Sequence, residues 1–210
     1  MLDFDYGNIE AVYRLAGPLS TTPRGTVRAM TDQPVNLAGD KSIVLVGLMG
    51  AGKSSVGTRL GKRLDMPFQD ADAEIVKAAG CSIEDIFTVY GEAAFRDGER
   101  RVIARLLGDR PQVLATGGGA FMDPETRQVI ERHAISVWLR ADLDILVERT
   151  GRRNDRPLLK EGDPREILES LIAERYPVYA EADIVVDTGV EPQEYTVEQI
   201  LDALSATAAS

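Results

Sequence analysis

Short apolar runs alternate with amphipathic stretches along the chain from residue 42 onward. The runs "SIVLVGL", "PFQDA", "QVLATG", "AISVWL" and "DIVVD" are typical of strands buried in a parallel sheet. Between them, as in "SSVGTRLGKRL" and "DGERRVIARLL", apolar positions recur at helical spacing. This alternation predicts an α/β domain of three layers, in which helices cover both faces of a five-stranded parallel sheet.

Two helix boundaries are indicated by individual residues. "SIED", which begins at Ser82, is a capping-box sequence and predicts a helix start, and Gly91 would end that helix. A later helix is predicted to begin near Pro164 and to end near Pro177, because proline suits a first turn and breaks a helix interior.

The first forty residues differ from the rest of the chain. They are rich in Gly, Pro, Ser and Thr and show little periodicity, which predicts a flexible extension over residues 1–40. Met30 lies inside this segment and is an alternative start of the natural chain. We expect a single domain over residues 41–210.

Composition and charge argue against several classes of protein. The net charge is −10 at pH 7, which argues against a generic nucleic-acid binder. A lone cysteine, Cys81, excludes an internal disulfide and agrees with a reducing compartment. No apolar run approaches the roughly 18 residues of a membrane span, and the N-terminus lacks a secretory pattern. We therefore expect a soluble, cytoplasmic monomer that binds neither nucleic acid nor membrane.

A glycine-rich loop follows the first predicted strand. "GLMGAGKS", residues 47–54, fits G-x-x-x-x-G-K-S and precedes a predicted helix. In such a loop backbone N–H groups bind phosphate, Lys53 reaches the β- and γ-phosphates and the Ser54 hydroxyl ligates Mg²⁺. The alternative is a chance glycine turn, which the flanking strand and helix disfavour. The N-K-x-D and D-x-x-G sequences of GTPases are absent from the chain, so a small kinase fits better.

Two carboxylates follow the second predicted strand, in "FQDADAEI". Asp70 and Asp72 are two residues apart, and such residues face the same side of a strand. At the carboxyl end of a sheet Asp70 would hold a Mg²⁺-bound water and Asp72 would accept a substrate hydroxyl proton. The alternative is an acidic helix N-cap, a role that Asp72 would also suit. The one histidine, His133, falls at a predicted helix end, so a carboxylate is the expected base.

A glycine triplet and several arginines are further candidates for contacts with a ligand. "LATGGGAF", residues 114–121, indicates backbone that turns tightly or approaches a ligand closely. Arg96 and Arg175 would form a clamp for a small carboxylic acid, or would simply be solvated. The pair of Arg96 and Glu99 is otherwise a plain surface salt bridge. "ERTGRRNDRPLLKEGD" is either an exposed loop or a lid whose Arg156 neutralises the transferring phosphoryl group.

Together these motifs resemble those of the shikimate kinase family. The resemblance covers about residues 42–204 and includes, in the family's order, "GLMGAGKSSVGTRLGKRL", "FQDADAEI", "SIEDIFTVYGEAAFRDGE", "ATGGGAF", "RNDRPLL" and "ERYPVYAEAD". It implies a P-loop kinase fold with a mobile lid at about residues 149–163. It also implies ATP-dependent phosphorylation of the 3-hydroxyl of shikimate, on the route to chorismate and aromatic amino acids.

The resemblance implies roles on the acceptor side. Asp72 would bind the ring hydroxyls and act as the base, and Arg96 and Arg175 would grip the carboxylate. Glu99 would orient Arg96. The backbone of Gly118 would contact the substrate, and the turn around it would be shaped by its neighbours Gly117 and Gly119.

On the nucleotide side the resemblance implies ATP contacts from the loop and the lid. Lys53 and Arg156 would stabilise the transferring phosphoryl group, Ser54 would ligate Mg²⁺, Asp70 would lie in its outer shell, and Arg149 would pack on adenine. The loop residues expected to wrap the phosphates are Gly50, Ala51, Gly52, Lys53, Ser54 and Ser55.

One departure from the family lies after the last predicted strand. Family members often carry a basic residue there, whereas this chain reads "DTGVEPQEY", and no adenine contact is assigned to that loop. Two other functions compete with the expected one: another small-metabolite kinase such as a gluconate kinase, and a non-catalytic nucleotide-binding module that regulates a partner.

Overall fold

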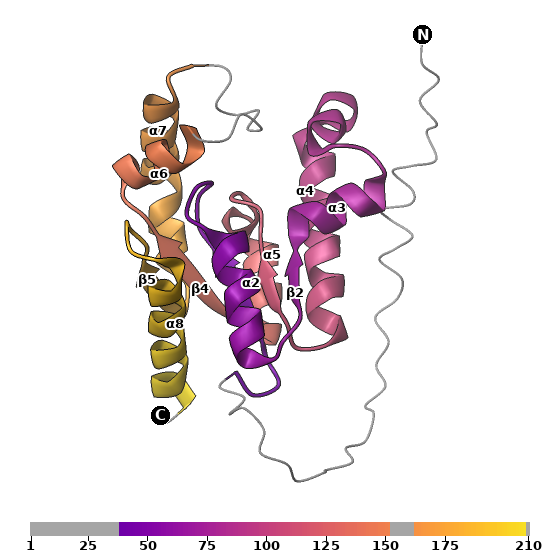
Figure 1. Ribbon diagram of the computed structural model, residues 1–210. Helices are drawn as coiled ribbons and strands as arrows, with labels where there is room; N and C mark the ends of the chain where they lie inside the picture. The colour runs from indigo at the N-terminus through magenta and orange to yellow at the C-terminus, as the bar shows by residue number, and fades with distance from the viewer. Residues whose placement is uncertain (1–37, 152–161, 209–210) are drawn as a thin grey trace.

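The computed structural model describes residues 38–151 and 162–208, which include a five-stranded sheet (Figure 1). The strand order is β2-β3-β1-β4-β5, and every neighbouring pair is parallel. All five predicted strands are confirmed. The predicted extension lies outside the described residues except for residues 38–40. The strands are β1 (Ser42–Val46), β2 (Phe68–Asp70), β3 (Val113–Ala115), β4 (Ala134–Arg140) and β5 (Ile184–Asp187).

Helices cover both faces of the sheet, which confirms the three-layer fold. Helices α2 and α8 lie side by side in front of the sheet in Figure 1, and α5 lies behind it, against β4 and α4. The helices are α2 (Lys53–Leu64), α3 (Ala71–Ala79), α4 (Ile83–Asp109), α5 (Pro124–His133), α6 (Leu143–Gly151), α7 (Pro164–Tyr179), α8 (Gln193–Ala208) and the short 3₁₀ helix η1 (Ala120–Met122).

The predicted helix boundaries are largely confirmed. Ser82 and Asp85 form the capping box at the start of α4, and Gly91 interrupts the helical conformation with φ 79°. Helical structure resumes directly after Gly91, so α4 contains two helical segments. Helix α7 begins at Pro164 as predicted but runs two residues past Pro177. Proline removes one N–H donor, yet the residues after it keep helical dihedrals in this last turn.

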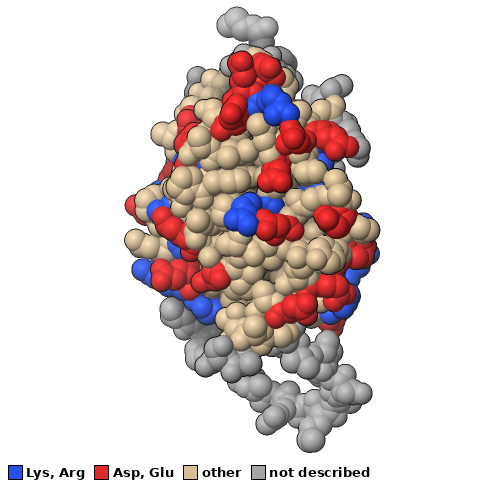
Figure 2. Space-filling model, turned by 90° about the vertical axis from the view of Figure 1, so that its left-hand side faces the viewer, with Lys and Arg blue, Asp and Glu red and all other residues tan. Residues whose placement is uncertain are grey.

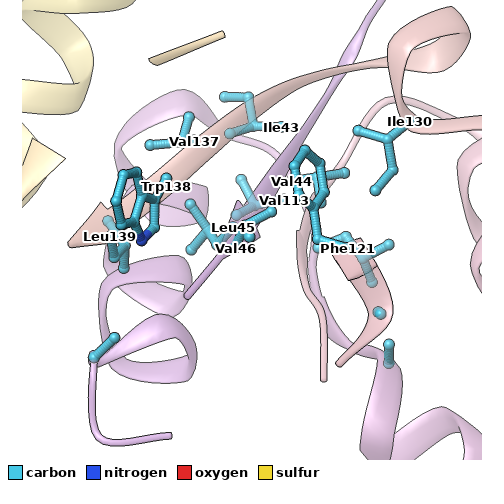
Figure 3. Packing of buried hydrophobic residues seen from close by; sticks show 14 of the residues in the cluster. Ile43, Val44, Leu45, Val46, Val113, Phe121, Ile130, Val137, Trp138 and Leu139 are labelled. Atoms are coloured by element: carbon cyan, nitrogen blue, oxygen red, sulfur yellow. The ribbon is translucent and has the colours of Figure 1, made fainter. Parts of the chain in front are cut away.

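The core is built around the central strand. Every residue of β1 is buried, and its register pairs Leu45 with Ala115 of β3 and with Val137 of β4. Figure 3 shows the β1 side chains packed with those of β3 and β4, with Phe121 and Ile130 nearby. Each such buried apolar side chain contributes about 1.5–3 kcal/mol. The loop that follows β1 is therefore anchored to the most buried strand of the sheet.

The surface follows the acidic composition of the chain. Figure 2 shows the face on the side of β5 and α8, where acidic side chains are spread among uncharged ones. Exposed acids of α8 include Glu194, Glu198 and Asp202, and Glu194 pairs with Arg59 of α2 at 2.7 Å. None of the helices within residues 38–151 and 162–208 is both long and apolar enough to cross a membrane.

Candidate active site

The carboxyl ends of the parallel strands bring the candidate loops to one edge of the sheet. The loop after β1 holds the G-x-x-x-x-G-K-S sequence, β2 runs directly into α3, and the loop after β3 holds the glycine triplet. Strand β3 lies between β1 and β2, so the triplet follows the strand that separates the other two loops. Ligands of open α/β sheets bind at this edge.

The loop between β1 and α2 has the geometry of a phosphate site. Gly52 is the N-cap of α2 with φ 97°, a left-handed conformation that favours glycine, and no side chain caps the helix. The first N–H groups of α2 are thus not used by a side-chain cap, which suits an anion at the helix N-terminus. Lys53 Nζ donates to the carbonyls of Gly47 and Leu48 at 2.6 and 3.1 Å, which holds the lysine against the loop.

Ser54 and Asp70 meet beside this loop. Ser54 Oγ donates to Asp70 Oδ2 at 2.8 Å, and the other carboxylate oxygen, Oδ1, accepts from the Asp72 N–H at 3.1 Å. A hydroxyl and a carboxylate are oxygen ligands of the kind that Mg²⁺ prefers, so the pair fits a magnesium site.

Asp72 does not lie on the second strand, contrary to the prediction. Strand β2 ends at Asp70, which is the N-cap of α3, and Asp72 lies in the first turn of that helix. The two carboxylates therefore do not share a strand face, and the suggested N-cap role belongs to Asp70. The extended pattern stops here because the Asp70 side chain caps the next helix.

The glycine triplet is surrounded by side chains that the sequence singled out. A Cβ added to Gly117 would lie 2.6 Å from Glu99 Oε1 and 2.8 Å from Asp72 Oδ1. A Cβ on Gly119 would lie 2.5 Å from Arg96 Nη2. A side chain at either position would have to displace these groups, so in the present arrangement the loop backbone itself meets the side chains of α3 and α4.

The middle glycine connects the triplet with both α7 and the phosphate loop. A Cβ on Gly118 would lie 3.4 Å from Arg175 Nη1 and 3.7 Å from the carbonyl oxygen of Gly47. Arg175 is 12% exposed and its Nε makes no hydrogen bond within the described part of the chain. Arg96 and Arg175, from two distant helices, therefore flank one loop that also borders the phosphate site.

Glu99 is buried rather than part of a surface salt bridge. It is 2% exposed, and its Oε2 accepts from Arg96 Nη1 at 2.7 Å. Burial raises the pKa of the Glu99 carboxyl, the charge of Arg96 opposes this rise, and the negative charges of Asp72 and Asp123 add to it. A buried carboxylate that holds an arginine in place is suited to orient it, because the guanidinium fork has few alternative positions.

Arg149 lies between the phosphate loop and the segment after β5. Its Nη1 donates to the Gly50 carbonyl at 3.3 Å and to Thr188 Oγ1 at 3.2 Å, and its Nη2 donates to the Gly189 carbonyl. Arg156 and most of the predicted lid lie outside the described residues.

Tyr179 is a residue of this region that the sequence reasoning missed. Its hydroxyl donates to the carbonyl of Gly118, and the side chain is fully buried. Tyr179 lies four residues after Arg175 on the same helix, so both side chains share one helix face. This spacing is the feature of the sequence that could have indicated Tyr179 as a neighbour of Arg175.

Comparisons with known proteins agree with this arrangement. The family model described as "Shikimate kinase" matches residues 49–205. The shikimate kinase of Paramagnetospirillum magneticum is 60% identical over 164 residues, which cover 78% of this chain and 84% of the relative. The shikimate kinase of Brucella canis is 47% identical over 186 residues, covering 89% of this chain and 93% of the relative.

A solved structure is similar as well. Shikimate kinase from Acinetobacter baumannii in complex with shikimate superposes with a TM-score of 0.77 at 35% identity, covering 80% of this chain and 95% of that one. The family model covers well over half of the chain, and these relatives match across most of their own length. The chain belongs to the shikimate kinase family.

Proposed function

We propose that the protein transfers the γ-phosphoryl group of ATP to the 3-hydroxyl of shikimate, which gives shikimate 3-phosphate and ADP in aromatic amino acid biosynthesis. The observation that carries this proposal is the junction at the glycine triplet. There Asp72, Arg96 and Arg175 converge, and Gly118 borders the carbonyl of Gly47 in the phosphate loop. A donor phosphate and a small acidic acceptor would thus be bound next to each other, which phosphoryl transfer requires.

On the donor side, residues 50–55 wrap the phosphates of ATP. Lys53 turns from its loop carbonyls to the β- and γ-phosphates and stabilises their charge. Ser54 would hold Mg²⁺, with Asp70 in its outer shell, and the bound ion would supply positive charge beside the phosphates. Arg149 packs on the adenine from its position between the two loops.

On the acceptor side, Arg96 and Arg175 hold the carboxylate of shikimate by bidentate hydrogen bonds. Glu99 keeps the Arg96 guanidinium oriented through the 2.7 Å bond. Asp72 binds the ring hydroxyls and accepts the proton of the 3-hydroxyl as the phosphoryl group arrives. Arg156, in the lid, neutralises charge on the transferring group and closes the site against water.

A coupled ADP-release assay with purified protein tests the proposal. We expect Mg²⁺-dependent turnover with shikimate and little with gluconate. Strong turnover of gluconate without turnover of shikimate would favour the other small-metabolite kinase. ATP binding without transfer to either acid would favour a regulatory module. We also propose that the enzyme is a cytoplasmic monomer, which light scattering of the purified chain would test for oligomeric state.

A further inference from the structure

The three carbonyls of the glycine triplet all accept hydrogen bonds. Those of Gly117 and Gly119 accept from the backbone N–H three residues further on, at 3.2 and 3.0 Å, in the local turns of η1. The carbonyl of Gly118 is different, because its donor is the side-chain hydroxyl of Tyr179, 61 residues away in the sequence. The middle peptide of the triplet is thus fixed by tertiary structure and not by the turn.

This arrangement determines where the N–H groups of the loop point. The carbonyl and the N–H of a trans peptide point in opposite directions, so a fixed Gly118 carbonyl also fixes the Gly119 N–H. The N–H groups of Gly118 and Gly119 make no hydrogen bond to any residue that the structure describes. They are the donors that the triplet offers to a ligand.

The Tyr179 side chain is enclosed by the core. It is 0% exposed and makes edge contacts with the rings of Phe121 and Trp138, at centroid distances of 6.4 and 5.9 Å. Burial raises the pKa of Tyr179 to about 12, against the opposing charge of Arg175. The phenol therefore remains a protonated donor at neutral pH.

Tyr179 and Arg175 also meet at the same glycine. A Cβ on Gly118 would lie 3.4 Å from Arg175 Nη1 and 3.9 Å from the Tyr179 hydroxyl. We infer that Tyr179 is a positioning residue for the acceptor: its hydroxyl draws the Gly118 carbonyl away from the substrate, so that the loop presents N–H groups beside Arg175. This inference rests on the proposed function, since it gives Tyr179 a role in the binding of shikimate.

Helix α7 offers a matched control. Tyr176 lies one turn earlier and its hydroxyl also donates to a backbone carbonyl, that of Ala141, which is outside the triplet. Tyr179→Phe and Tyr176→Phe each remove one buried or half-buried phenol oxygen without changing the ring. The two variants differ in which carbonyl loses its donor.

Steady-state kinetics with both substrates varied test the inference. We expect Tyr179→Phe to raise the KM for shikimate about tenfold or more, because the Gly118 carbonyl loses its partner and the loop peptide is released. The KM for ATP should stay within about twofold of wild type, because the phosphate loop keeps its contacts. Tyr176→Phe should leave both KM values close to wild type, while thermal unfolding shows similar midpoints for the two variants.

The inference would be overturned if Tyr179→Phe and Tyr176→Phe had equal KM values for shikimate. It would also be overturned if Tyr179→Phe raised the KM for ATP as much as the KM for shikimate. A third variant, Phe121→Leu, removes one ring contact of Tyr179 but keeps the hydroxyl. It should lower the unfolding midpoint and raise the KM for shikimate less than Tyr179→Phe does, because the hydroxyl remains, whereas a rise matching that of Tyr179→Phe would implicate packing and overturn the assignment. Failure of the wild-type enzyme to phosphorylate shikimate would instead refute the proposed function.

Discussion

Replacing Gly119 by alanine tests whether Arg96 is positioned by direct contact with the glycine triplet. The added Cβ would lie 2.5 Å from Arg96 Nη2, whereas ordinary contacts begin near 3.4 Å, so the guanidinium must retreat by about 0.9 Å. Such a retreat would lengthen the 2.7 Å bond between Arg96 Nη1 and Glu99 Oε2 by up to that amount, to at most about 3.6 Å, at which distance it is no longer a hydrogen bond.

Losing a hydrogen bond between charged groups costs about 1.5–3 kcal/mol. If this hydrogen bond also stabilises the transition state by that amount, its loss should lower kcat/KM for shikimate by about 10- to 150-fold. The KM for ATP should change little, because the contacts of Lys53 and Ser54 are separate from Arg96. Coupled ADP release with each substrate varied in turn measures both effects.

Gly118→Ala is the comparison variant. Its Cβ would be 3.4 Å from the nearest atom, an ordinary contact, so its unfolding midpoint should stay close to that of wild type. For Gly119→Ala we expect a midpoint lower by about 3–12 °C, from the same loss of stability. A Gly119→Ala enzyme with wild-type midpoint and wild-type kcat/KM for shikimate would refute the reasoning.

Three further changes address the other roles. Asp72→Asn should leave ATP affinity nearly intact in a binding titration and abolish most turnover, because the base is lost; an equal loss of ATP affinity would contradict that role. Arg96→Lys should chiefly raise the KM for shikimate, since a point charge replaces a bidentate fork, and a wild-type KM would argue against the clamp. The pKa of Glu99 is higher in the folded protein than in the unfolded chain. The free energy of unfolding should therefore fall as pH rises above the ordinary pKa of about 4.3, because ionisation of Glu99 then costs more in the folded state. The unfolding midpoint of Glu99→Gln relative to wild type should therefore increase from pH 4 to pH 7; a constant difference would exclude the effect.

The sequence by itself determined the local structure and the chemistry of the phosphate loop. Buried strands, capping boxes and the G-x-x-x-x-G-K-S loop depend on residues close together in the chain, and their periodicity and hydrogen bonding can be read directly. Alternation along the strand gave the wrong position for Asp72, because the side-chain cap from Asp70 ends the strand two residues before Asp72. Local reasoning also placed the end of α7 two residues too early.

Only the tertiary structure decided that Arg96 and Arg175 meet at one loop. Their convergence depends on the strand order, which places β3 between β1 and β2 and so directs the glycine triplet between the phosphate loop and α3. Nothing in the positions of Arg96 and Arg175 along the chain shows this, because contacts between distant segments are selected by the packing of the whole core. A side chain at Gly117 or Gly119 would have to displace the side chains that the fold packs against the triplet, which are Glu99 and Asp72 at the first position and Arg96 at the second.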